Sequence, residues 1–433
     1  MGRFNGSKKD LGKVVIRVVS ILGVVGCIAS GCGPNPSYDA SDSYISSKGV
    51  RSGGSGKLAT NCVSNNNVSW ENDKVQQSAD IVDKVAKDEK GNVIYSPLSL
   101  DMILGMMQFN SKGNVKEYMG NVLMSDNYDD FAKGYTKSIL SDDNRKISNS
   151  IWVNKRKSLK GKYKKGVKKF YQAKIKNVNF NDREDVANKV NKWADKSTDG
   201  MIKEIIGPRD VDPGKLAILC NAVYMKGAWE EKLYEVESKS KFQGLDGKTE
   251  MIHFLKNKSD KYGYSENKYA EAVSMKLDNG NEFIAILPKD SIDFELWNLD
   301  INSLIEGDKL ESGKYDITVT LPKIKYTTNI NLTKILNDMG YGKIFSFNFN
   351  NMSGSESSLS NIKQSATIDL DENGVKAAAI TVAIFDNAMV IEPEQKEEKI
   401  VNFNRPYCYI IRDSKTKTIW FMGKVVNVDG QEE

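Results

Sequence analysis

Histidine is nearly absent from this chain of 433 residues, which contains only His253. A Ser-His-Asp or Cys-His mechanism would have to use that side chain as its base. His253 lies in the apolar run at residues 250–255, which predicts a structural histidine, and neither Gly-x-Ser-x-Gly nor His-Glu-x-x-His occurs. We therefore expect no enzymatic activity.

Cysteine is also scarce, with five residues and no Cys-x-x-Cys spacing, so we expect no metal site. Cys220 and Cys408 lie in apolar runs, which predicts buried thiols rather than a disulfide. The sequence Gly244-x-x-Gly247-Lys248-Thr249 has two residues between its glycines, where a phosphate loop requires four. It predicts a hairpin turn, and we expect no cofactor.

Charge is nearly balanced, with 62 Lys and Arg against 57 Asp and Glu, so a nucleic-acid partner is not expected. One segment departs from this balance, because residues 155–176 hold eleven Lys or Arg and no acid. Two interpretations stay open, a polyanion site and a solvated helix face with its flanks. The polyanion site would use Lys155, Arg156, Lys157, Lys164, Lys165, Lys168 and Lys169.

Long hydrophobic runs are missing as well. The apolar run at residues 18–28 is too short to span a bilayer, and the basic residues before it predict an export signal. Val24-Val25-Gly26-Cys27 resembles a bacterial lipobox, with Cys32 as a second candidate and a plain cleaved signal as the alternative. We expect a signal at 1–32, a Ser/Gly/Asn-rich tether at 33–67 and a domain at 68–430. The protein would then be exported, and either attached to the membrane only through a lipid anchor at the cell surface or secreted.

Periodicity within the domain predicts a mixture of helices and strands. We expect helices at 70–90, at 100–123 with a break at Gly113, at 186–194 and at 331–339 with a stop at Gly340. We expect strands at 146–154, 216–227, 270–276, 282–288 and 315–326. Asn221 is an anomaly in the otherwise apolar run at 216–227, because a buried amide requires hydrogen-bond partners.

Residues 372–385 have the pattern of a strand with one thin face. A turn-competent Asn373-Gly374 pair precedes the run, and alternate positions from Val375 to Ala383 carry small side chains. The polar, acidic stretch at 386–399 follows, so the whole segment at 374–403 is predicted to be a long exposed loop. A loop with this pattern could become a strand.

Residues 371–381, Asp-Glu-Asn-Gly-Val-Lys-Ala-Ala-Ala-Ile-Thr, resemble the reactive-loop hinge of the serpins, Glu-Glu-x-Gly-Thr-x-Ala-Ala-Ala-x-Thr. Further motifs similar to that family occur in its order at 92–99, 216–229, 286–288, 321–324, 403–407 and 421–427. The resemblance implies an α+β serpin fold with three β-sheets, eight or nine helices and an exposed reactive loop at about 374–400.

The resemblance also assigns site residues. The hinge would be Glu372, Gly374, Val375, Ala377, Ala378, Ala379 and Thr381, with Val375 in place of the usual Thr or Ser. The shutter, where the central strands part, would hold Ser96, Ser99, Asn221 and Gln364, the last in place of the usual histidine, and Trp229 would mark the breach where the loop enters. The scissile bond would be Ala388-Met389 or the neighbouring Met389-Val390.

The implied function is suicide-substrate inhibition of serine, or sometimes cysteine, endopeptidases. The protease cuts the loop and forms an acyl-enzyme, and insertion of the cut loop into the central sheet traps it. An apolar scissile bond suits elastase-like, subtilisin-like or chymotrypsin-like enzymes, and we expect a monomer. The alternative is a non-inhibitory serpin fold used as a surface binding or carrier protein.

Overall fold

The computed structural model describes residues 16–27, 67–89, 91–125, 128–139, 142–289, 295–354, 357–372 and 396–428. These residues form three large β-sheets, one two-stranded ladder and eight α-helices. The predicted fold class, α+β with three sheets and eight or nine helices, is confirmed.

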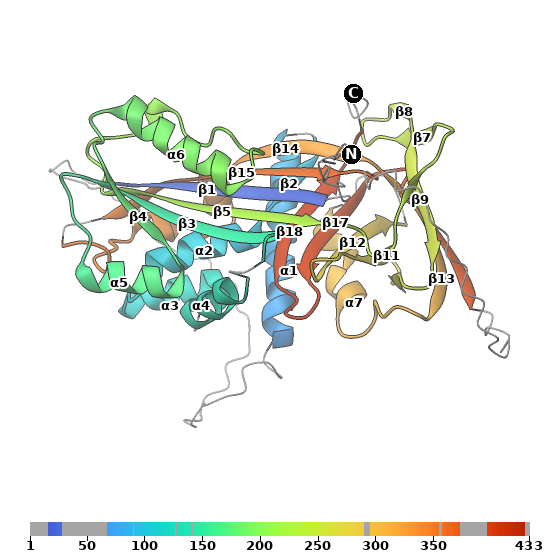
Figure 1. Cartoon of the computed structure of the whole chain (residues 1–433). Coiled ribbons are helices and arrows are strands. Elements are labelled where there is room, and N and C mark those ends of the chain that lie inside the picture. The colour runs from blue at the N-terminus through green and yellow to red at the C-terminus, as the bar shows by residue number, and fades with distance from the viewer. Residues whose placement is uncertain are drawn as a thin grey trace, which may run out of the picture.

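The largest sheet has six strands. Neighbouring strands within it run antiparallel, except β3 and β4, which run parallel. Its order across the sheet is β14 (Ile324–Asn331), β15 (Ser358–Leu370), β1 (Ile16–Cys27), β5 (Ala217–Gly227), β3 (Arg145–Asn154) and β4 (Lys174–Val178). Figure 1 shows β1, from the N-terminal part of the chain, lying between β15 and β5 in the middle of this sheet.

The remaining strands extend from the middle of the molecule, where β2 and β18 lie, to the end that holds β9 and β13 (Figure 1). A second six-stranded sheet has the order β10 (Gly263–Glu266), β11 (Ala270–Lys276), β12 (Asn281–Pro288), β17 (Tyr407–Asp413), β18 (Ile419–Val425) and β2 (Val93–Tyr95). A four-stranded sheet has the order β16 (Glu397–Asn402), β13 (Tyr315–Pro322), β9 (Phe254–Ser259) and β6 (Tyr234–Glu235). The ladder pairs β7 (Ser240–Gln243) with β8 (Thr249–Ile252) around the predicted hairpin turn.

Helices cover both faces of the largest sheet (Figure 1). On one face lies α6 (Arg183–Ser197), and on the other lie α2 (Pro97–Gln108), α3 (Gly113–Leu123), α4 (Tyr128–Ser138) and α5 (Gly161–Phe170). The others are α1 (Asn67–Glu89), α7 (Ile301–Ile305) and α8 (Leu332–Asp338), with 3-10 turns η1 (Pro208–Asp210), η2 (Leu296–Leu299) and η3 (Gly342–Ser346).

Local sequence explains where several helices begin and end. The side chain of Ser96 accepts a hydrogen bond from the backbone N–H of Ser99, and Pro97 occupies the first turn of α2, where its missing N–H costs nothing. Asn331 caps α8 in the same way, and Gly340 beyond its end has a φ of +83°. The predicted break at Gly113 is also present, since α2 ends at Gln108 and α3 begins at Gly113.

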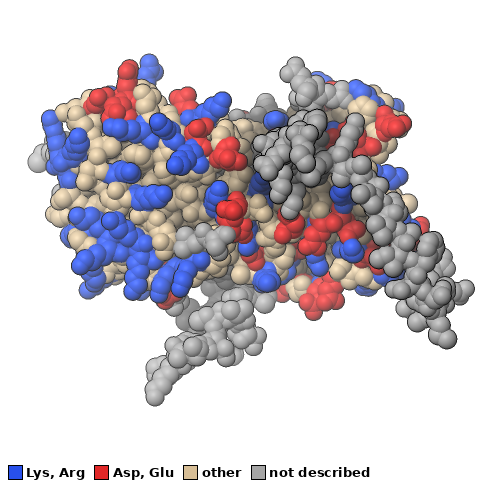
Figure 2. Space-filling model, in the orientation of Figure 1, with Lys and Arg blue, Asp and Glu red and all other residues tan. Residues whose placement is uncertain are grey.

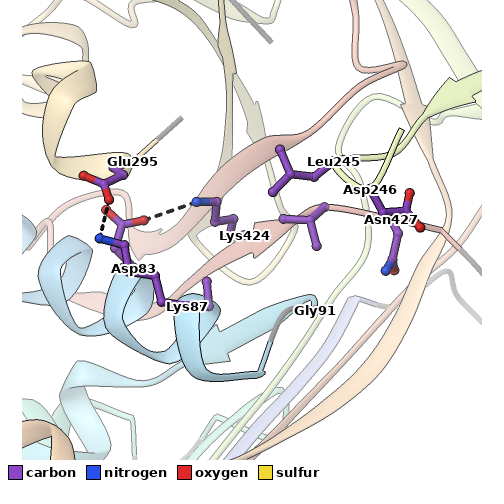
Figure 3. A pocket seen from close by; sticks show the side chains of 10 residues that line it. Asp83, Lys87, Gly91, Leu245, Asp246, Glu295, Lys424 and Asn427 are labelled. Carbon is purple, nitrogen blue, oxygen red and sulfur yellow. Dashed lines mark hydrogen bonds and ion pairs between the residues drawn. The ribbon is translucent and has the colours of Figure 1, made fainter. Parts of the chain in front are cut away.

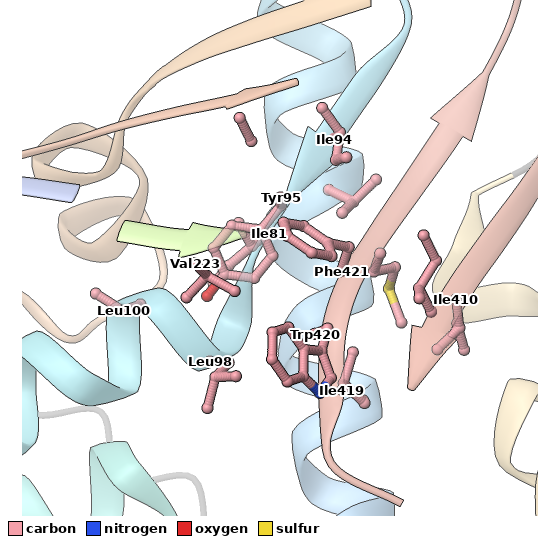
Figure 4. Packing of buried hydrophobic residues seen from close by; sticks show 14 of the residues in the cluster. Ile81, Ile94, Tyr95, Leu98, Leu100, Val223, Ile410, Ile419, Trp420 and Phe421 are labelled. Carbon is pink, nitrogen blue, oxygen red and sulfur yellow. The ribbon is translucent and has the colours of Figure 1, made fainter. Parts of the chain in front are cut away.

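One contiguous core joins the two large sheets. Figure 4 shows its centre, where Leu98 of α2 and Tyr95 of β2 lie beside Trp420 and Phe421 of β18 and Ile81 of α1. These side chains are at most 2% exposed. Because α2 and β18 share this core, the start of α2 has a fixed position beneath the middle of the largest sheet.

Three expectations differ from the structure. The run at 315–326 is two strands, β13 and β14, that belong to different sheets and meet at Lys323. The predicted loop ends earlier than residue 403, because residues 397–402 form β16, parallel to β13, with Val401 fully buried. The charged residues at the start of that edge strand conceal its pattern. The apolar run at 18–28 lies largely in β1, and its role in export stays a prediction.

Candidate functional site

A chain of buried polar groups runs beneath the centre of the largest sheet on the β5 side. Ser99 Oγ donates to Asn221 Oδ1 at 2.6 Å, and Asn221 Nδ2 donates to Asn149 Oδ1 of β3 at 2.9 Å. Asn149 Nδ2 in turn donates to the carbonyl of Tyr171 at 2.7 Å. Asn221 has no exposed surface, so both ends of its amide are satisfied inside the protein.

A matching set of hydrogen bonds holds the other side. Gln364 of β15 accepts from the Ser96 N–H at 2.9 Å and donates to the Ser96 carbonyl at 3.0 Å. Ser96 Oγ donates to the carbonyl of Trp420 at 2.7 Å. The first turn of α2 therefore binds β15 through Ser96 and β5 through Ser99. The structure brings the four predicted shutter residues together around this turn.

The strands held by this turn do not pair with each other. β1 separates them, and its residues are in antiparallel register with both β5 and β15. Leu22 lies opposite Asn221 on one side and opposite Gln364 on the other. We call this lane between β5 and β15 the slot. The polar turn of α2 lies beneath the middle of the slot.

An ion-pair cluster lies at the end of the slot next to Leu370, the last residue of β15. We call this end the upper end. Glu372 lies 2.6 Å from the ammonium of Lys323, which also pairs with Glu235 of β6. Burial alone would lower the pKa of Lys323, but the two carboxylates outweigh it and raise that pKa. The hydrogen bond from Lys323 lowers the pKa of Glu235. The last described residue before the predicted loop is thus tied to the four-stranded sheet, which contains both β13 and β6.

His253 lies beside this cluster, between β8 and β9. Its Nδ1 is 3.0 Å from the carbonyl of Val236 and 3.9 Å from a carboxylate oxygen of Glu235. Neither partner is the hydroxyl or thiol that a Ser-His-Asp or Cys-His mechanism requires. The predicted structural role of this histidine agrees with these contacts.

Trp229 is 5% exposed and packs edge to face on Phe283 of β12, with ring centroids 5.6 Å apart. Its backbone bridges to Leu277. Its indole N–H has no hydrogen-bond partner among the described residues. The tryptophan is therefore fixed by packing rather than by polar contacts.

Several predicted site residues lie outside the described residues. They are Gly374, Val375, Ala377, Ala378, Ala379, Thr381, Ala388, Met389, Val390 and Cys32. Cys27 is the last residue of β1. These assignments stay predictions.

The basic segment surrounds α5. Lys155, Arg156 and Lys157 form the turn after β3, and Lys164, Lys165, Lys168 and Lys169 lie on α5. All but the half-buried Lys157 are exposed. Figure 2 shows blue side chains gathered over this end of the molecule, and no ion pair joins these seven residues to any other described residue. The structure therefore keeps both interpretations of this segment open.

A cavity of about 290 Å³ lies between α1, β18 and the turn of the β7–β8 ladder (Figure 3). Its charged walls are paired, because Lys424 lies 3.4 Å from Asp83 and Lys87 binds Glu295. This cavity was not predicted from the sequence. None of its lining residues belongs to β1, β5 or β15, the strands of the slot.

Other site types are not found in the described part of the chain. It contains no group of three His, Cys, Asp or Glu residues arranged to hold a metal. None of its helices has the length and apolarity needed to cross a membrane. Cys220 and Cys408 are free buried thiols, as predicted, and burial raises the pKa of Cys220 to about 12.

Two contributors to the site were not predicted from the sequence. Asn149 completes the polar chain under β5, and Lys323 with Glu235 holds Glu372. The available indication for Asn149 was its place inside the strand predicted at 146–154, which also ends in Asn154. The partner of Lys323 lies 88 residues away in sequence, and no local pattern could find it.

Comparison with known proteins gives consistent matches. The family model "Serpin (serine protease inhibitor)" matches residues 74–428. Human Serpin I2 is 27% identical over 399 residues, covering 87% of this chain and 94% of that protein. Mouse Leukocyte elastase inhibitor A is 25% identical over 357 residues, covering 77% and 93%. The solved structure of native protease nexin-1 with heparin has a TM-score of 0.67 at 22% identity, covering 84% of this chain and all of that one.

Proposed function

The chain belongs to the serpin family, whose members are generally protease inhibitors, and we propose that it inhibits serine endopeptidases as a suicide substrate. The protease attacks the loop after β15 and forms an acyl-enzyme. The cut loop then enters the slot between β5 and β15 and carries the enzyme along before hydrolysis is complete.

The observation that carries this proposal is the geometry of the slot. β15 ends at Leu370, next to the start of β1, and β1 runs antiparallel to β15 along its length. A loop that turns back after residue 372 would run along the slot in the same direction as β1. The slot therefore has the direction and pairing edges that an inserting loop requires.

The register of insertion follows from the turn. If Asn373-Gly374 forms a two-residue hairpin turn, Glu372 pairs with Val375 and each later residue pairs with one further back along β15. Leu370 then faces Ala377, Ile368 faces Ala379, and Gln364 faces Ala383. The scissile region arrives at the far end of β15, roughly 40 Å away for a dozen residues at about 3.3 Å each.

This register selects the face on which each loop residue would lie. The even-numbered residues of β15 from Ile362 to Leu370 are at most 1% exposed, and Gln364 among them binds the start of α2. Directly opposed residues in an antiparallel pair point to the same face. The buried face therefore receives the small residues Ala377, Ala379, Thr381 and Ala383. A turn one residue longer would reverse the faces.

The ion-pair cluster at the upper end of the slot holds the start of the loop at the point where insertion would begin. Lys323 anchors Glu372 at the entry, so the first inserting residues begin beside β14 and β15. The pair is partly exposed, and such pairs contribute about 0–1 kcal/mol. Glu372 can therefore be held in place without a large barrier to loop entry.

We propose an elastase-like, subtilisin-like or chymotrypsin-like target. Ala388-Met389 and Met389-Val390 offer a small or medium apolar side chain to the primary pocket of the protease. One curated relative is named Leukocyte elastase inhibitor A. Neither bond offers the basic residue that a trypsin-like pocket requires.

The direct test incubates residues 68–433 with pancreatic elastase, subtilisin, chymotrypsin and trypsin in turn. We expect a band at the summed mass on a denaturing gel with one of the first three, and a released C-terminal peptide that begins at Met389 or Val390. Cleavage without an adduct, and without a rise in the melting temperature of the cut protein, would refute the inhibitor and leave the non-inhibitory binding protein.

We also propose that the basic segment binds an anionic polymer. Its exposed cations lack ion-pair partners among the described residues, so they are available to a polyanion. Lys168→Ala/Lys169→Ala on α5 should weaken binding to a sulfated polysaccharide column and lower its salt dependence. Lys189→Ala/Lys192→Ala on α6 is the matched control, and equal losses would indicate a nonspecific charge effect.

Attachment to the membrane is proposed through Cys27. The test expresses the chain in a lipoprotein-processing bacterium and measures the mass of the mature N-terminus. Diacylglycerol on Cys27 is expected, and Cys27→Ser should abolish it. Lipid on Cys32, or an unmodified secreted chain, would replace the proposed site by one of the alternatives.

A further inference from the structure

The slot holds a segment that is predicted to leave the protein. β1 pairs with β15 from Arg17 to Cys27 and with β5 from Ile16 to Val25. Both of its edges are therefore hydrogen-bonded along most of its length. The predicted cut before Cys27 would remove every residue of this 12-residue strand except the last.

We propose that the N-terminal segment is an internal plug of the slot, and that signal processing is the step that makes the protein competent to trap a protease. The proposal rests on the proposed function, since a plug matters only if the loop must enter the slot. In the precursor the slot is filled and the cut loop has no lane. After processing the lane is vacant.

β1 and the inserted loop would use the same edge of β15. The loop register places Ala378 opposite Asp369 and Ala383 opposite Gln364. In the structure these same positions of β15 face Arg17 and Leu22 of β1. One edge of a strand can pair with only one neighbour, so the loop and β1 cannot occupy the slot together.

β1 has the composition of a central strand. Six of its twelve residues are Ile or Val, and Arg17 is its single charge. Such a segment suits a strand in the middle of a sheet. The apolar run that suits an export signal therefore also suits the slot.

The chain between β1 and α1 is long enough for β1 to enter or leave the slot. Residues 28–66 connect β1 to α1, and 39 residues can span on the order of 130 Å when extended. That is more than the length of the slot, so the connection allows β1 to enter or leave without unfolding α1. The connection also keeps the plug at high local concentration while the chain is uncut.

The occupancy of the slot can be tested by crosslinking at one register position. Gly23 lies directly opposite the native Cys220, so Gly23→Cys should form a disulfide with Cys220 when the full chain folds in an oxidising buffer. Cys27, Cys32 and Cys62 are changed to Ser in this background. The control is Gly26→Cys, which lies three residues further along β1 and should not crosslink to Cys220.

The consequence is tested on the full chain, synthesised without an export system so that it stays uncut. Wild type should give at least tenfold less adduct with the cognate protease than Val19→Pro/Ile21→Pro, because proline removes N–H donors from a strand paired on both edges. Val19→Ala/Ile21→Ala is the matched control and should stay close to wild type. The oxidised Gly23→Cys chain should form no adduct.

Each outcome decides a different claim. If Cys220 forms no disulfide with the thiol introduced by Gly23→Cys, the plug is refuted, whether or not the protein inhibits a protease. A crosslinked chain that still forms the adduct, or equal adduct from wild type and the proline variant, overturns the exclusion and leaves the inhibitor standing. A disulfide with no adduct from any variant, including residues 68–433, refutes the proposed function and with it the role of processing.

Discussion

Ala379→Arg tests the insertion register more sharply than any other single change. In the proposed register residue 379 enters opposite Ile368, which has no exposed surface, on the face that packs over α2. Arginine there would place a charge in the core with no acidic partner. Because residue 379 lies only five positions after Gly374, it must enter early in the insertion.

The magnitude follows from the cost of an unpaired buried charge, about 3–5 kcal/mol. Each 1.36 kcal/mol added to a barrier slows a step about tenfold. Insertion should therefore slow on the order of 10²- to 10⁴-fold if the full cost falls on its barrier, while cleavage of the exposed loop stays unchanged. Hydrolysis of the acyl-enzyme would then outrun insertion, and the variant would become a substrate.

Ala378→Arg is the matched control, one residue away. Residue 378 faces Asp369, on the outer side of the sheet, where the side chain of Asp369 is 29% exposed and lies 3.3 Å from Lys325. An arginine there stays in contact with water and meets a carboxylate. Inhibition by this variant should stay close to wild type.

The assay is a titration of the cognate protease with each variant, read as moles of inhibitor consumed per mole of enzyme inactivated. We expect a ratio near that of wild type for Ala378→Arg and a much larger ratio for Ala379→Arg. The reverse order would mean that the register is shifted by one residue. Equal ratios for the two variants would refute insertion along this edge.

Three further predictions concern the described residues. Asn221→Ala leaves two buried groups unpaired at about 1–3 kcal/mol each. At roughly 2.1 cal/mol/K per residue over the domain at 74–428, this loss lowers Tm by about 3–8 °C, whereas the exposed control Asn337→Ala should change Tm by less than about 1 °C. Burial would raise the pKa of Glu282, but Arg412, Lys417 and the hydrogen bond from Ser274 together outweigh it and lower that pKa. Arg412→Met removes one of these partners and leaves Lys417 3.2 Å from Glu282, so it should cost no more than the about 3–5 kcal/mol of a fully broken buried pair at pH 7. Its Tm deficit should shrink at acid pH as Glu282 takes up a proton. Lys323→Met breaks a partly exposed pair and should lower the free energy of unfolding by less than about 1 kcal/mol. It should also change the rate at which a cut loop inserts, and this rate is measured as the rise in Tm with time after cleavage.

Elements with a strong local pattern could be predicted from the sequence. The continuous apolar run of β5, the proline at the start of α2 and the Gly340 stop of α8 each have a local physical cause. Asn221 stood out because polar groups in such strands need partners. Its partners on α2 and β3 could not be identified, since they come from segments 122 and 72 residues away.

The remaining differences arise where one pattern serves two structures. A short apolar run after basic residues is typical of an export signal, yet the same residues fit the central strand β1. In β16 the acidic residues before Ile400 concealed a strand whose pairing with β13 is decided elsewhere in the chain. The ion-pair cluster at Lys323 depends on charges from three separate segments, so only the fold brings them together.

The two amides at the shutter suit a sheet that must exist in two forms. Asn221 and Gln364 both lie opposite Leu22, so they would become neighbours if the slot emptied and β5 closed against β15. In the filled form Gln364 binds the backbone of Ser96, whereas Asn221 accepts from Ser99 and donates to Asn149. Each amide carries both a donor and an acceptor, so the two could also hydrogen-bond to each other in the closed form.

An amide at position 364 also removes a titratable group from the shutter. A histidine there would change charge between pH 5 and 8, whereas Gln364 does not. We therefore expect the insertion rate of the cut loop to be flat across this range. Gln364→His should introduce a dependence on pH, because protonation would place an uncompensated charge beside Ser96 beneath the slot. If the insertion rate of wild type already varies with pH, His253 beside the ion-pair cluster is the residue to replace. A rate that no longer varies with pH in His253→Gln would show that insertion is controlled at the entry of the slot rather than at the shutter.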